Sequence, residues 1–180
     1  MSAFARLATA AGLALLTLLP QAASAQTSHA REGFWFNGGM GYGSLGCDGC
    51  SGREGALSGG LAIGGSLSQK LLIGAGTNAW SKSENGATLT VGTLTALVRF
   101  YPSASGGLFL LGGLGLGSVH AEISGFGSDT ETGVGALVGI GYDFRVGSNV
   151  SLTPYWNGFA ASTSSTDMNV GQLGLGVTLH

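Results

Sequence analysis

The sequence predicts an all-β fold, an eight-stranded antiparallel up-and-down transmembrane β-barrel preceded by a cleavable signal peptide. Three observations support this prediction. The chain begins with a short apolar leader, the rest of the chain has no apolar run long enough for a spanning helix, and apolar residues alternate with small or polar ones. Alternation with a period of two is typical of strands whose two faces meet different surroundings.

The composition does not suit an ordinary soluble domain. Hydrophobic residues make up 44% of the 180 residues, charged residues make up 9%, and 35 residues are glycine. A soluble domain carries about 25% charged residues and about 7% glycine, so this chain offers water little charge. The formal net charge of −2 provides no basic patch, and no nucleic-acid partner is expected.

A secretory signal peptide is expected at residues 1–25. Arg6 is its only charged residue, the segment 7–19 is rich in Leu and Ala, and small residues precede a cleavage site between Ala25 and Gln26. The apolar run is shorter than the roughly 20 residues of a spanning helix, so an uncleaved anchor is the less favoured alternative. Loss of Arg6 leaves six Lys and Arg against nine Asp and Glu, a mature net charge of −3.

The C-terminal segment shows the alternation most clearly. Every odd position from Leu173 to Leu179 is large and apolar, and the even positions are Gly, Gly and Thr before the terminal His180. After a short periplasmic lead at 26–32, eight such segments form the predicted barrel domain, 33–180. Each exceeds the roughly 9–11 residues that a tilted spanning strand needs. The expected strands are 33–46, 55–67, 70–82, 87–101, 107–122, 132–146, 150–161 and 168–180.

The connecting segments predict the orientation of the barrel. Short turns are expected on the periplasmic side and longer loops outside, and an even number of strands places both chain ends in the periplasm. The expected turns are 66–69, 102–106 and 147–149, and the expected external loops are 47–54, 83–86, 123–131 and 162–167. Aromatic residues near the periplasmic ends of strands are expected to form a girdle there, as membrane barrels have at their interfaces. They are Phe34, Trp35, Phe36, Phe100, Tyr101, Tyr142, Phe144, Tyr155 and Trp156.

A soluble β-barrel or sandwich is the main alternative fold. Such a fold would turn its apolar face inward and show charge to water. Here the face opposite the apolar one is mostly Gly, Ser, Thr and Ala, which suits the narrow lumen of an eight-stranded barrel better than a wet surface.

Cys47 and Cys50 form a C-x-x-C in the exported part of the chain, where a structural disulfide is expected. A redox site would need a thioredoxin-like context, and the flanking residues here are Gly and Ser. Haem attachment would need His in place of Ser51, and zinc would need two further ligands nearby. No cofactor and no metal site are therefore predicted.

The predicted barrel pattern, the segment from Gly141 to Tyr155 and the closing segment from Gly174 to His180 resemble the small outer-membrane β-barrel family, which includes the OmpA membrane domain and OmpX. The resemblance covers nearly all of 33–180. It implies location in the outer membrane, contact with its lipid, a filled lumen, and a last strand read by the barrel-assembly machinery. That strand usually ends in Phe or Trp, whereas here Leu179 takes the apolar position and one residue follows it.

Polar residues on the predicted lumen face give two functional alternatives. By parity along the strands these residues are Asn37, Asn78, Arg99, Asp143, Arg145, Tyr155, Asn157 and Gln172. Buried charges need partners, so we expect a sealing network in which Arg99, Asp143 and Arg145 pair. The alternative is a narrow channel for small solutes. The sealed barrel would have a structural, envelope-integrity or loop-mediated interaction role.

A lipid-modifying enzyme is the second alternative. Ser118, His120 and Glu122 share one face of an expected strand, and nucleophile, base and orienting acid are the residue types of acyl transfer. Some small outer-membrane barrels are lipid A deacylases, but their longer local motif is absent here. Residues at i, i+2 and i+4 of one strand spread over about 13 Å, too far for a triad, so the chain is predicted not to be an enzyme.

Overall fold

The computed structural model describes residues 31–125 and 127–180. The expected signal peptide and its cleavage site between Ala25 and Gln26 lie outside these residues, as does most of the expected lead 26–32. In the part of the chain that is described, no helix is long and apolar enough to cross a membrane.

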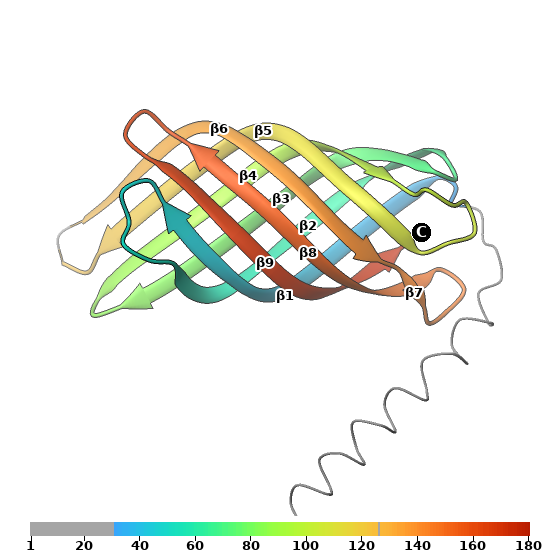
Figure 1. Cartoon of the computed structure of the whole chain (residues 1–180), viewed down its shortest axis with the longest axis horizontal. Helices are drawn as coiled ribbons and strands as arrows, with labels where there is room; N and C mark the ends of the chain where they lie inside the picture. The colour runs from blue at the N-terminus through green and yellow to red at the C-terminus, as the bar shows by residue number, and fades with distance from the viewer. Residues whose placement is uncertain (1–30, 126) are drawn as a thin grey trace, which may run out of the picture.

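Eight long strands and one very short strand form a single antiparallel sheet that closes on itself, as predicted (Figure 1). Neighbours along the chain pair in order from β1 to β6, β1 also pairs with β9, and pairing of β6 with β8 closes the barrel. Closure satisfies the backbone N–H and C=O groups, which a hydrocarbon surrounding demands. The strands are β1 Phe34–Cys47, β2 Glu54–Ser68, β3 Leu71–Glu84, β4 Ala87–Phe100, β5 Leu108–Ile123, β6 Gly127–Tyr142, β7 Phe144–Arg145, β8 Val150–Ser162 and β9 Asp167–Leu179.

The outer wall is apolar, and the side chains alternate along each strand as the sequence predicts. In β9, Leu173 is 68% exposed and Gln172 is fully buried. Large apolar side chains are exposed around the whole wall, far more than a water-soluble surface carries. The wall therefore faces lipid, and the buried face lines the lumen.

One loop prediction is wrong. The segment 123–131 was expected as an external loop, but β5 continues to Ile123 and β6 begins at Gly127, so the two strands project beyond the apolar wall as a hairpin. Outside the hydrocarbon both faces of a strand meet water. Polar residues then occupy both faces, and the period-two signal disappears.

The expected aromatic girdle is only partly formed. Phe34, Phe100 and Phe144 face outward, whereas Trp35 and Tyr101 are fully buried in the lumen. The prediction used only the position of these residues along their strands, which is near the periplasmic rim. The face of the strand from which a ring projects decides whether it contacts lipid or the lumen.

Candidate functional site

Two apolar clusters fill most of the lumen, one toward each end of the barrel. The external cluster consists of Leu45, Trp80, Val91, Leu137, Phe159, Ala161 and Val170. The periplasmic cluster consists of Trp35, Leu72, Leu97, Tyr101 and Phe109. An eight-stranded barrel has an interior just wide enough for side chains, and these aromatic rings occupy it.

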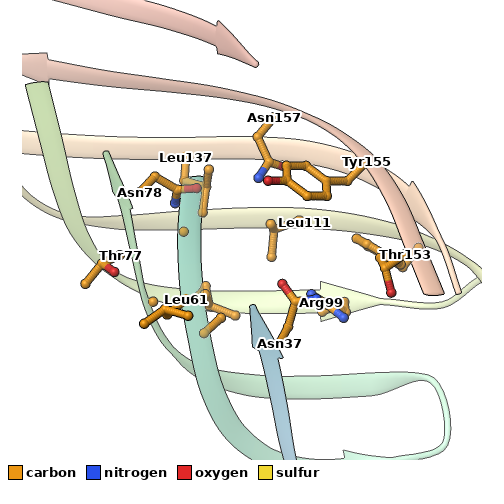
Figure 2. Close-up of a pocket in the computed structure, with 15 residues that line it drawn as sticks. Asn37, Leu61, Thr77, Asn78, Arg99, Leu111, Leu137, Thr153, Tyr155 and Asn157 are labelled. Atoms are coloured by element: carbon orange, nitrogen blue, oxygen red, sulfur yellow. The ribbon is translucent and has the colours of Figure 1, made fainter. Parts of the chain in front are cut away.

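A small cavity lined by both polar and apolar side chains lies between the clusters. The cavity has a volume of about 30 Å³, and Figure 2 shows Asn37, Arg99, Tyr155 and Asn157 at its walls. Beside it, Gln172 Nε2 donates to the Tyr155 hydroxyl at 2.8 Å. A cavity of this size with several polar groups in its wall suits one or two water molecules, not a solute path.

Arg99 is the buried cation of the lumen, 2% exposed. Its guanidinium carbon lies 4.2 Å from the Phe109 ring centroid and 4.9 Å from that of Trp35, so cation–π contacts hold the charge. Over the described ranges, Arg99 makes no salt bridge with Asp143 or another carboxylate. Aromatic rings thus contact the Arg99 guanidinium, where an ion pair was predicted.

Asp143 is the centre of a second network at the periplasmic mouth. Its carboxylate accepts hydrogen bonds from the Tyr101 and Thr153 hydroxyls, each at 2.7 Å, and His180 Nε2 lies 3.4 Å away. Burial alone would raise the pKa of Asp143. The hydrogen bond from His180, the positive charge of Arg99 and the two hydroxyl donors overcome burial and lower that pKa to about 2.

Arg31 adds the N-terminal end of the described chain to this mouth. Its guanidinium lies 3.6 Å over the Tyr101 ring and donates to the backbone carbonyls of Gln69, Ala104 and Gly106. The mouth is thereby blocked by a set that we name the periplasmic plug: Arg31, Tyr101, Asp143, Thr153 and His180.

The other predicted network residues lie nearby. Asn37 Nδ2 donates to Thr178 Oγ1 at 2.8 Å and to the Val177 carbonyl at 3.3 Å. Asn157 is 8% exposed and lines the cavity. Arg145 lies in β7 and is half-buried. It interacts electrostatically with Arg31 and Asp143. The predicted residues thus lie in the lumen or at its mouth. However, aromatic rings contact the charge of Arg99, and hydroxyl groups contact the charge of Asp143.

Sequence reasoning missed four of the five members of the plug. Thr153 was not singled out among the residues of its strand. Arg31 lies in the expected lead, Tyr101 was assigned to the girdle, and His180 was treated as a terminal extra residue. Parity could have indicated Tyr101, which shares the side of β4 that carries the buried Arg99. His180 continues the even positions of the last strand, of which Gln172 and Thr178 are fully buried, so parity could have indicated it too, whereas Arg31 precedes the first strand and belongs to no repeating pattern.

Ser118, His120 and Glu122 lie on the outer side of β5, toward its external end. His120 Nδ1 is hydrogen-bonded to Thr130 Oγ1 of β6 at 2.7 Å, and not to Ser118 or Glu122. The imidazole is therefore oriented by the neighbouring strand rather than by a nucleophile or an acid.

The disulfide between Cys47 and Cys50 is present, with the two Cα atoms 5.4 Å apart. It closes the start of the loop that leads from β1 to β2. A backbone hydrogen bond from Cys50 to the Cys47 carbonyl and a positive φ of 80° at Gly49 complete the turn.

A closed antiparallel barrel with a lipid-facing wall and a filled lumen defines an integral membrane protein of the outer-membrane type. The chain matches the outer membrane protein β-barrel domain family over residues 11–180, and it belongs to that family. The protein is thus an integral protein of the outer membrane. A comparison with curated protein sequences finds no match.

Solved structures agree with this fold. Ail of Yersinia pestis, crystallised with the heparin analogue sucrose octasulfate, is 17% identical, covers 82% of this chain and 99% of its own, and superposes with a TM-score of 0.59. Neisserial surface protein A is 19% identical, covers 84% and 98%, and gives a TM-score of 0.58. At these identities the likeness concerns the fold.

Proposed function

We propose that this protein is a sealed barrel that supports the outer membrane mechanically and presents its external loops to a partner. The observation that carries this proposal is the filled lumen. The two apolar clusters occlude it, the cavity between them holds about 30 Å³, and the periplasmic plug closes the mouth. A solute path would have to displace buried Trp and Phe side chains and break the hydrogen bonds of Asp143.

Planar-bilayer recording tests the proposal. The refolded protein should insert without stepwise conductance, with the heat-unfolded protein as the control for contaminants. Insertion is checked separately by the change in gel mobility on boiling. Discrete, reproducible current steps from the folded protein would replace the sealed barrel with the narrow channel.

We propose further that the barrel is not an enzyme. The Thr130 hydrogen bond of His120 and the outward, in-line placement of Ser118 and Glu122 support this view. Mass spectrometry of lipid A from cells with and without the protein should give the same acyl composition. A loss of acyl chains that Ser118→Ala abolishes would establish a deacylase.

The charge of the external end indicates the kind of partner. Arg53 and Lys82 are the basic residues at this end, and seven carboxylates accompany them. The acidic residues are Asp48, Glu54, Glu84, Glu122, Asp129, Glu131 and Asp167. Ail was crystallised with a polyanion, but in these loops the carboxylates outnumber the two basic residues, which favours soluble cationic partners. Polylysine should bind the protein in nanodiscs with affinity that falls as salt rises, and sucrose octasulfate should not. The reverse preference would refute this assignment.

We also propose that β9 is the segment that the barrel-assembly machinery recognises. Leu179 pairs with Phe36 and Val150 and is 42% exposed on the lipid side, where the family usually has an aromatic residue. Leu179→Asp should strongly reduce assembly in cells, whereas Leu179→Phe should retain it. Equal assembly of the two variants would exclude β9 as the signal.

A further inference from the structure

The outer wall carries a groove of about 350 Å³ on β6, β8 and β9, three strands that lie side by side in Figure 1. Its floor consists of small residues that face outward in register. Ala136 lies opposite Ala160, and Gly158 lies opposite Gly171. We name this feature the outer-wall groove. Its volume falls within the range of about 300–1,000 Å³ that is typical of small-molecule sites.

Large side chains bound the groove on its periplasmic side. The next outward-facing row contains Ile140, Trp156 and Leu173, which are paired across the same three strands. These side chains are 43%, 43% and 68% exposed. The indole of Trp156 leans toward the floor, because a Cβ atom placed on Gly158 would lie 3.3 Å from its Cη2 atom. The groove is therefore a depression with an apolar ledge.

The groove runs from the external rim toward the middle of the wall. Asn169 lies near the external end of β9, whereas Ala136 lies closer to the periplasmic end of β6 than to its external end. Strands of such barrels tilt by about 35–45°, so a row of paired residues changes depth as it crosses them. This path matches a lipid acyl chain that descends from the headgroup level.

Arg53 caps the external end of the groove. Its Nη1 donates to Asn169 Oδ1 at 2.8 Å and its Nε donates to Ser44 Oγ at 3.0 Å. These two acceptors belong to the outer faces of β9 and β1, so the guanidinium is held against the outside of the wall. It remains exposed to solvent and headgroups.

Arg53 forms no ion pair within the described chain. Lys82 forms salt bridges with Glu54 at 2.7 Å and Glu84 at 2.8 Å, whereas Arg53 forms none. The nearby Asp167 accepts a hydrogen bond from Ser162. Arg53 is thus a fixed cation at headgroup level that lacks an anion, and guanidinium binds phosphate well in such places.

We propose that the outer-wall groove binds one acyl chain of a phosphorylated lipid of the outer leaflet, and that Arg53 binds its phosphate. A second copy of the barrel fits less well. Two copies related by an axis normal to the membrane would bring their Arg53 side chains together at one level, with like charges facing. The proposal rests on the location in the outer membrane and not on the sealed lumen. Its experiment can therefore fail while the proposed function holds, and the reverse.

The test uses variants that change the groove without disturbing the barrel. A Cβ atom on Gly171 would meet no atom within 4 Å, so Gly171→Leu fills the groove at little cost to the fold. Gly112→Leu is the matched control, because Gly112 also faces lipid and has the same open space, but Val138 separates it from the groove. Arg53→Gln removes the charge and keeps a hydrogen-bonding side chain. Each variant is first checked for its change in gel mobility on boiling.

Native mass spectrometry of the protein released from detergent micelles, with added lipid A or dephosphorylated lipid A, gives the readout. The wild type and Gly112→Leu should retain one lipid A per barrel. Gly171→Leu should lose both lipids, and Arg53→Gln should weaken lipid A binding at least about tenfold, as expected for hydrogen bonds to a charged group. Binding that is equal in all four proteins would show non-specific lipid and overturn the proposal. A dimer that Gly171→Leu abolishes would assign the groove to a second copy and would also overturn it.

Discussion

Replacement of Asp143 by Asn should destabilise the barrel by roughly 2–3 kcal/mol at neutral pH. Burial works against the charge of Asp143, yet its pKa lies at about 2 instead of its ordinary value of 3.8. At about 1.4 kcal/mol per pH unit, this difference stabilises the ionised form over the protonated form by roughly 2–3 kcal/mol. Loss of one of the two hydroxyl donors, at about 1.5–3 kcal/mol for a hydrogen bond to a charged group, gives a similar figure.

The stability of the barrel should also depend on pH. The pKa of Asp143 is lower in the folded protein than in the unfolded chain, so its contribution is complete above about pH 5. It is lost as the pH falls from there toward the folded value of about 2. The charged and titratable groups around Asp143 are Arg99 on β4, Arg145 on β7, Tyr101 and the terminal His180, and the Thr153 hydroxyl on β8 also contacts it.

Urea unfolding in phospholipid vesicles, followed by tryptophan fluorescence at pH 7 and at pH 2–5, measures both effects. Asp129→Asn is the control, because Asp129 is exposed on the external hairpin and, among the described residues, its carboxylate accepts a hydrogen bond from the neighbouring backbone N–H of Thr130. It should change stability by less than about 0.5 kcal/mol. The wild type should lose its advantage over Asp143→Asn as the pH falls. A constant difference between the two across this range would refute the role of the ionised carboxylate.

Three further predictions use the same preparations. Trp80→Ala should cost about 3–5 kcal/mol in urea unfolding, because a fully buried ring leaves a cavity in the external cluster; a loss below 1 kcal/mol would mean that the lumen is loosely packed. Gly41→Val should prevent closure and abolish the heat-dependent gel shift, since a Cβ atom there would lie 2.0 Å from the Leu173 carbonyl oxygen of β9. The double variant Cys47→Ser, Cys50→Ser should lose about 2 kcal/mol at most, because the disulfide closes a short loop, and a non-folding variant would contradict this.

The spanning part of the fold could be predicted from the sequence because the two sides of its strands meet different surroundings. The alternation assigned Val138 to lipid and Leu137 to the lumen, and the structure confirms both. The same rule fails once a strand leaves the hydrocarbon. The part of β6 that begins at Gly127 is polar on both faces, so no alternation there predicts a strand.

The contacts of the plug and the groove could not be predicted, for a different reason. Arg31 and His180 reach the periplasmic mouth from opposite ends of the chain, and no spacing links them. The outer-wall groove depends on the register that sets Gly158 opposite Gly171 and Ala136 opposite Ala160. A shift of two residues in either strand pair would keep every residue on its face and still destroy the groove.

The fold of this barrel does not require glycine at position 171. Many lumen-facing glycines are required by the fold, as at Gly41, where a Cβ atom would overlap the backbone of β9. Gly171 faces lipid, has an ordinary backbone conformation, and would accept a side chain without contact. A glycine inside a strand costs about 0.5–1 kcal/mol relative to alanine, and packing within the barrel does not require it here. Gly112 has the same open space, so it is the outer-wall groove around Gly171 together with the unpaired guanidinium of Arg53 that assigns this site to a phosphorylated lipid.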